Sequence, residues 1–105
     1  MLDTAAPTLL LPTRDPAEAL AALFGREIRH VWLEGGPTLA AAFLRAGLVD
    51  EVVTYLAPAL LGSGPPAVGD LGIPSIDRTL RLTVRDVRTL GPDIRIRATT
   101  PQGEL

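Results

Sequence analysis

Hydrophobic and polar positions alternate along the first half of the chain in the manner of alternating strands and helices. Short apolar runs at residues 8–11, 28–33 and 51–56 predict buried strands, and apolar residues at helical spacing in 16–24 and 37–46 predict amphipathic helices. Because a helix joins the first two strands, we expect them to be parallel neighbours in one sheet. The order predicted for this half is β-α-β-α-β.

Local signals mark the ends of both helices. Asp15 precedes Pro16 and is followed by Glu18, a pattern typical of an N-cap with a capping-box acid, and Gly25 is expected to end the first helix in a left-handed conformation. The second helix is expected to begin at Pro37 and to stop at Gly47. We expect it to bury its apolar residues Leu39, Ala42, Phe43 and Ala46.

The second half of the chain has a different period. Residues 59–77 contain seven glycines and prolines, which predicts a long loop, and residues 80–87 then alternate apolar side chains with arginine and threonine. A phase slip indicates a bulge near Asp86, and the turn at 91–93 leads into a second alternating segment over 94–97. These segments predict an antiparallel hairpin whose arginines solvate its polar face rather than bind a ligand.

Together these elements predict one α/β domain over residues 1–100 with a mixed sheet, namely β-α-β-α-β followed by an antiparallel C-terminal hairpin. Residues 101–105 are expected to form a disordered tail.

Composition excludes several classes of function. The net charge is −2 and all ten basic residues are arginines without a basic block, so we expect no nucleic-acid partner. The absence of cysteine and the single histidine, His30, argue against a zinc site. The apolar runs are too short to cross a bilayer and the N-terminus does not resemble a signal peptide, so a cytoplasmic location without membrane contact is expected.

The candidate binding site is the junction of the second predicted strand and the second helix, Glu34–Leu39, which we call the Gly-Gly turn. Gly36 is expected to be the N-cap and Pro37 the first helical residue, which leaves the amides of Thr38 and Leu39 without helical partners at the positive end of the helix dipole. Such a site binds phosphate, although an ordinary strand-to-helix connection has the same sequence. Glu34 is either a solvated acid or a carboxylate that accepts N–H groups from a polar part of the ligand.

Three segments of this sequence resemble the reductase domain of bacterial bifunctional riboflavin-biosynthesis proteins. They are Leu33-Glu34-Gly35-Gly36-Pro37-Thr38-Leu39, Phe43-Leu44-Arg45-Ala46-Gly47-Leu48-Val49-Asp50-Glu51 and Tyr55-Leu56-Ala57-Pro58-Ala59-Leu60-Leu61-Gly62. The resemblance spans residues 8 to about 98. It implies a fold similar to the C-terminal half of dihydrofolate reductase.

The resemblance also implies an activity, the NADPH-dependent reduction of 5-amino-6-(5-phosphoribosylamino)uracil to the ribitylamino compound. The family motif places Gly35, Gly36, Pro37, Thr38 and Leu39 against the phosphates of NADPH. It places Glu34 at the uracil end of the substrate, and Thr13 and Arg14 toward the adenosine side, where arginine can meet a 2′-phosphate. No catalytic proton donor is assigned, since hydride transfer depends chiefly on positioning.

The family's upstream strands and zinc deaminase domain have no counterpart in this sequence, so Met1 is interpreted as a start inside a longer protein and little turnover is expected from the chain alone. Two alternatives remain open, a non-catalytic assembly module and an unrelated βαβ phosphate binder. Self-association is expected under the reductase and assembly hypotheses alike, because a partial sheet exposes its edges.

Overall fold

The computed structural model describes residues 10, 11 and 13–104, which divide into two compact units at Leu33/Glu34. The first unit contains α1 (Pro16–Phe24), with the predicted bounds. Asp15 caps it as predicted, since its carboxylate accepts from the Ala17 amide at 3.2 Å. Glu18 does not close a capping box; its carboxylate instead accepts from the Thr13 hydroxyl at 2.6 Å.

The end of α1 differs from the prediction. Gly25 has a right-handed φ of −62°, so the expected left-handed stop is wrong at this position. The reversal occurs at Glu27, whose φ is +66°. Backbone hydrogen bonds from Glu27 to Phe24 and from Ile28 to Leu23 close the turn, so the chain changes direction two residues later than predicted.

The two N-terminal strands are not part of the described sheet. Residues 8 and 9 lie outside the described residues, and Leu10 and Leu11 have no regular structure. Residues 28–33 also lack strand structure, and Trp32 is 68% exposed, so the prediction of an inner parallel strand here is wrong for this structure. An apolar run becomes a strand only when another strand accepts its backbone hydrogen bonds, and none of the described residues pairs with it.

The second unit begins before α2 (Pro37–Arg45), which starts at the predicted residue and is followed by Gly47 at φ +68°. Its buried face is not the predicted one. Ala41 is 2% exposed, whereas Leu39 and Ala46 are exposed and Ala42 and Phe43 are only half-buried. Small size explains the difference, because Ala41 lets the loop backbone at Gly69 approach the helix closely.

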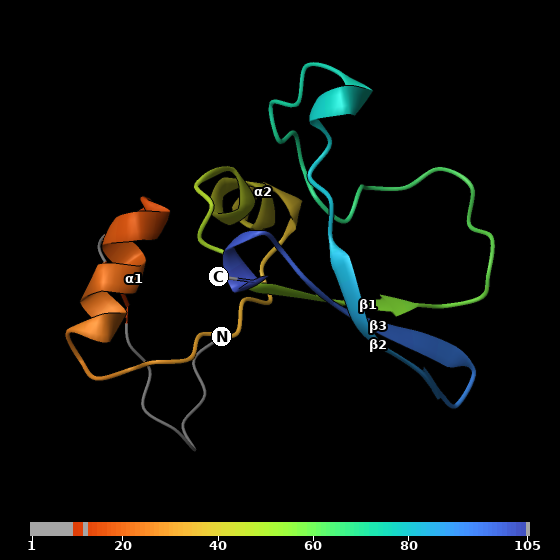
Figure 1. The fold of residues 1–105 in the computed structure, drawn as a ribbon, viewed down its shortest axis with the longest axis horizontal. Helices are drawn as coiled ribbons and strands as arrows, with labels where there is room; N and C mark the ends of the chain where they lie inside the picture. The colour runs from red at the N-terminus through yellow and green to blue at the C-terminus, as the bar shows by residue number, and fades with distance from the viewer. Residues whose placement is uncertain (1–9, 12, 105) are drawn as a thin grey trace. The chain divides into compact units, whose positions relative to one another are not determined.

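Three strands form an antiparallel sheet in the order β1-β3-β2, with β3 in the middle (Figure 1). They are β1 (Glu51–Leu56), β2 (Thr83–Leu90) and β3 (Asp93–Thr99). The predicted hairpin is confirmed, with Gly91 at φ +59° and a register shift between Val84 and Asp86. The α/β class is therefore confirmed, but the sheet of the described residues is antiparallel throughout instead of mixed.

A long connection leads from β1 to β2, drawn in green to cyan in Figure 1, and contains the short 3-10 helix η1 (Ile76–Arg78). It touches α2 at two points. The Gly69 amide donates to the Pro37 carbonyl at 2.9 Å, and Arg45 donates to the Asp70 carbonyl at 2.7 Å. The middle of the predicted loop is therefore held against the helix.

A buried threonine links the end of β3 to the start of β1. Thr100 is 1% exposed; its amide donates to the Asp50 carbonyl at 3.0 Å, and its hydroxyl donates to the carbonyls of Val49 and Asp50. Residues Gln102–Glu104 then form the 3-10 helix η2 in place of the disorder expected for the tail. The Gly103 amide donates to the Thr100 carbonyl at 3.0 Å, so η2 is also hydrogen-bonded to Thr100.

The two faces of the sheet differ in chemistry. Alternation along the paired strands places one set of apolar side chains on a single face: Val52, Leu56, Val84, Val87, Ile94, Ile96 and Ala98. We call this set the apolar sheet face. Ala98 is 4% exposed, whereas more than half of the surface of Leu56, Val84 and Val87 is exposed. Burial is thus confined to one end of this face.

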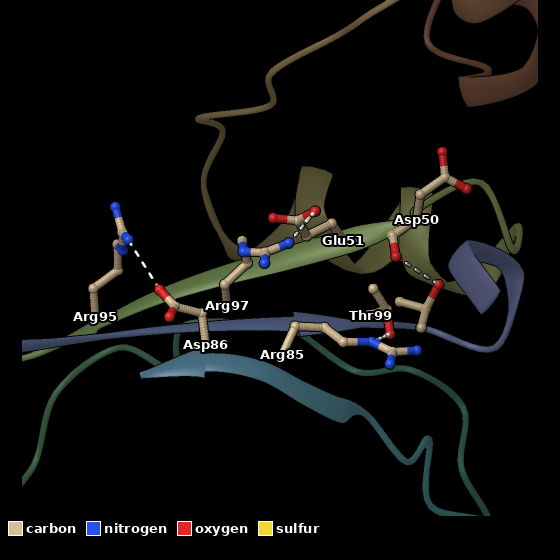
Figure 2. Close-up of polar contacts among 8 residues, drawn as sticks. Asp50, Glu51, Arg85, Asp86, Arg95, Arg97 and Thr99 are labelled. Atoms are coloured by element: carbon tan, nitrogen blue, oxygen red, sulfur yellow. Dashed lines mark hydrogen bonds and ion pairs between the residues drawn. The ribbon is translucent and has the colours of Figure 1, made fainter. Parts of the chain in front are cut away.

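The opposite face is polar, and its arginines contact other side chains (Figure 2). Asp86 pairs with Arg95 at 3.2 Å and with Arg88 at 3.3 Å, and Arg97 pairs with Glu51 at 3.5 Å. The pairs of Asp86 with Arg95 and of Arg97 with Glu51 connect neighbouring strands, whereas Asp86 and Arg88 both lie on β2. The hairpin arginines thus cover the polar face of the sheet, as predicted.

Candidate functional site

The Gly-Gly turn forms the N-terminus of α2, as predicted. Gly36 is the N-cap with φ −73° and ψ −179°, Pro37 is the first helical residue, and no side chain of the described residues caps the helix. The Ala40 amide donates to the Gly36 carbonyl at 3.0 Å, which is the first bond of the helix. Among the described residues no acceptor bonds to the amides of Thr38 and Leu39, so both are available to an anion.

The two glycines of the turn have different surroundings. A Cβ atom added to Gly36 would meet nothing within 4 Å, whereas one added to Gly35 would lie 2.5 Å from Cδ2 of Leu39. Gly35 therefore allows Leu39 to fold back over the turn, while Gly36 leaves open space beside the first amides. A ligand phosphate can approach the backbone at Gly36 without displacing a side chain.

The loop contact fixes the position of this helix end. The Pro37 carbonyl accepts the Gly69 amide, and a Cβ atom on Gly69 would lie 3.2 Å from that carbonyl oxygen. A larger residue at position 69 would push the loop away from the first turn of α2. Thr38 and Leu39 are exposed beside this contact, so the loop supports the turn without covering their side chains.

Glu34 directly precedes the two glycines and is exposed. A carboxylate at this place repels phosphate but accepts N–H donors, as the amide and amino groups of a pyrimidine provide. Its position beside the helix N-terminus is compatible with the role that the resemblance implies, and that role stays a prediction.

Thr13 and Arg14, the other two predicted binding residues, belong to the first compact unit. The Thr13 hydroxyl accepts from the Asp15 amide at 3.1 Å and donates to Glu18, so it organises the start of α1. Arg14 is exposed. The Gly-Gly turn belongs to the second unit, and the contribution of Thr13 and Arg14 to adenosine binding stays a prediction.

Residues 10, 11 and 13–104 contain no helix long and apolar enough to traverse a membrane. The same residues include no cluster of three or more His, Cys, Asp or Glu side chains suited to holding a metal ion.

Comparison with known proteins decides the family. The sequence profile of the RibD C-terminal domain matches residues 2–96. The chain belongs to the RibD C-terminal domain family. This confirms the resemblance drawn from the three sequence segments, and it removes the alternative of an unrelated βαβ phosphate binder.

Relatives within the RibD C-terminal domain family support this assignment at the level of sequence and fold. The riboflavin biosynthesis protein RibD of Mycobacterium tuberculosis is 45% identical over 94 residues, covering 90% of this chain and 27% of its own length. The 5-amino-6-(5-phosphoribosylamino)uracil reductase of Buchnera aphidicola is 35% identical over 71 residues, covering 67% of this chain and 34% of that protein. The structure of Acinetobacter baumannii RibD superposes with a TM-score of 0.76 at 34% identity, covering 86% of this chain and 26% of that one. The chain thus spans about a quarter to a third of these RibD relatives.

Two contacts that hold the loop against α2 were not predicted from the sequence. The contact of Gly69 with Pro37 and the bond from Arg45 to Asp70 join residues that are 32 and 25 positions apart. The glycines and prolines of 59–77 indicated a loop but carried no signal for its docking on α2. A contact between a loop glycine and a helix can be recognised only when the positions of both are known.

Proposed function

We propose that this chain supplies the phosphate-binding turn of an NADPH-dependent reductase that acts on 5-amino-6-(5-phosphoribosylamino)uracil in riboflavin biosynthesis. The observation that carries the proposal is the N-terminus of α2, where two amides without an acceptor among the described residues adjoin a glycine with open space around it. Family membership and the activity named for the Buchnera relative support it.

Each residue of the turn has a part in this proposal. The amides of Thr38 and Leu39 donate to the diphosphate, Gly36 admits it to the backbone, and Pro37 fixes the direction of the first helical turn. Glu34 accepts N–H groups of the pyrimidine and so orients the substrate. NADPH supplies the hydride, and the contribution of this chain is to hold cofactor and acceptor in place.

Preference for the phosphorylated cofactor is assigned to Arg14, whose guanidinium would meet the 2′-phosphate. An Arg14→Gln variant is expected to lose the preference for NADPH over NADH. Because more than half of each relative lies outside the aligned region, we expect little turnover from this chain by itself.

The test is calorimetric titration of NADPH into the chain and into Gly36→Asp. This substitution places a carboxylate in the open space beside the amides at a backbone conformation that aspartate tolerates. We expect affinity to fall at least about tenfold, or about 1.4 kcal/mol. Gly64→Asp, in the loop outside the turn, is the matched control and should bind as the parent does. Equal binding by Gly36→Asp and the parent would remove the turn from the proposal.

The second candidate is a non-catalytic assembly module, and the exposed apolar sheet face favours it. Leu56 on β1 and Val84 and Val87 on β2 present apolar surface that a second copy can cover, and β1 and β2 are both sheet edges in the described residues. Light scattering with and without NADPH separates the two. Self-association together with indifference to millimolar nucleotide would favour the assembly module.

A further inference from the structure

A concave site lies at the opposite end of α2 from the Gly-Gly turn. Its volume is about 420 Å³, and its walls come from the last turn of α2, the loop at residues 71–73, residues 78–81 and Pro101. This volume falls in the range of small-ligand sites. We call it the arginine cavity because Arg45, Arg78 and Arg81 line it.

The charges of the arginine cavity are not balanced by acids. Among the described residues no carboxylate lies within ion-pairing distance of Arg78 or Arg81, and Arg45 donates to a carbonyl oxygen, that of Asp70. On the polar sheet face, by contrast, Arg95 and Arg97 are paired with carboxylates. Three arginines line one concavity, and like charges held near one another favour the binding of an anion.

Local hydrogen bonds hold the wall that carries two of these arginines. The Arg78 amide donates to the Ser75 carbonyl at 3.0 Å, and the Thr79 hydroxyl donates to the Ile76 carbonyl at 2.6 Å. That hydroxyl proton is occupied, so the Thr79 oxygen can only accept a further hydrogen bond. The side-chain donors of the cavity are consequently guanidinium groups, whose planar geometry suits bidentate contact with phosphate.

Apolar side chains complete the cavity. Leu44, Ile73 and Leu80 are among those that line it, so part of the surface suits the carbon skeleton of a ligand. The nine residues of α2 extend about 13 Å, which separates this cavity from the amides at Gly36 by the length of the helix. A phosphate bound here is therefore a different group from any held at the Gly-Gly turn.

We propose that the arginine cavity binds a phosphate monoester, with the guanidinium groups of Arg78 and Arg81 on the phosphate oxygens and Arg45 beside them. The dianionic charge and the three oxygens of such a group suit several guanidinium donors better than a carboxylate does. The organic part of the ester lies on the apolar wall.

The test titrates inorganic phosphate and ribose 5-phosphate into the ¹⁵N-labelled chain and follows its amide and arginine Nε signals. We expect ribose 5-phosphate to bind more tightly than inorganic phosphate and to shift Arg78 and Arg81. The double variant Arg78→Gln/Arg81→Gln should weaken binding at least about tenfold. The corresponding double lysine variant should retain binding within a few fold, since it keeps the charge. Arg26→Gln/Arg29→Gln, an equal charge change at two exposed residues of the first unit, should behave as the parent.

Three results would overturn the proposal. The first is equal binding by the parent and the double glutamine variant, with circular dichroism showing that both are folded. The second is an equal loss in Arg26→Gln/Arg29→Gln, which would show that the effect depends on overall charge alone. The third is the absence of saturable binding of either probe below about 10 mM. Gly36→Asp separates the two sites, because phosphate binding that it abolishes and the double variant preserves would belong to the turn.

Discussion

Replacing Thr100 with valine tests the link between β3 and β1. Valine has nearly the same shape as threonine, so the substitution removes the hydroxyl from a site that is 1% exposed without opening a cavity. The amide of residue 100 can still donate to the Asp50 carbonyl, which keeps that acceptor satisfied. The Val49 carbonyl, in contrast, loses the hydroxyl that donates to it.

The expected cost follows from these contacts. A neutral hydrogen bond contributes about 0.5–1.5 kcal/mol net, and a buried carbonyl left without a donor costs about 1–3 kcal/mol. The added methyl group offsets up to about 0.8 kcal/mol of this loss. We therefore expect Thr100→Val to lower the free energy of unfolding by about 1–2 kcal/mol, which moves the urea midpoint down by about 0.5–1 M.

Urea titration followed by far-UV circular dichroism measures this change, and hydrogen exchange of peptides covering β1 and β3 locates it. Thr89→Val is the matched control, since Thr89 is exposed on β2 and valine favours strands. The control should be neutral or slightly stabilising. If Thr100→Val unfolded at the same urea concentration as the parent, the hydrogen bonds of Thr100 would not stabilise the strand pair.

Two further predictions concern the turn and the polar sheet face. Gly35→Ala should lower the free energy of unfolding by about 1 kcal/mol because its methyl group overlaps Leu39. Gly36→Ala should change that free energy by less than about 0.5 kcal/mol and still weaken NADPH binding. Urea titration measures the stability and calorimetry the binding, and an equally large stability loss in Gly36→Ala would contradict the open space beside Gly36. Asp86→Asn should cost about 1 kcal/mol by removing the negative charge that pairs with Arg95, and the loss should shrink in 1 M NaCl. An unchanged loss at high salt would show that packing rather than charge is responsible.

Elements with strong local signals were predicted with accurate bounds. Asp15 before Pro16 and Gly36 before Pro37 marked the starts of both helices, because capping and the fixed φ of proline act within a few residues. The β1 bounds and the bulge before Asp86 were also predicted, since alternation and its phase slip are local properties.

Elements that depend on distant partners were not predicted. Residues 28–33 have the composition of a buried strand, but a strand also needs a neighbour, and the described residues provide none. The pairing of β1 with β3 had no local signal because about 40 residues separate the strands. For the same reason the arginine cavity, assembled from α2, the loop and η1, could not be inferred from the spacing of Arg45, Arg78 and Arg81.

The candidate turn was predictable because its chemistry is local. Consecutive glycines, a proline and the first helical amides all lie within Glu34–Leu39, so sequence order alone placed them together. Whether Thr13 and Arg14 reach the cofactor depends on tertiary structure, so binding experiments have to test their predicted role.

The strand order β1-β3-β2 determines how the sheet can be assembled. The β2–β3 hairpin forms over a short turn. Pairing of β1 with β3, in contrast, requires the closure of a connection of several dozen residues. The entropy of closing such a connection rises only with the logarithm of its length, by about 0.6 kcal/mol for a doubling. Insertions between Pro58 and Gly64 should therefore be tolerated, which makes this stretch a practical place to graft a tag or a reporter peptide.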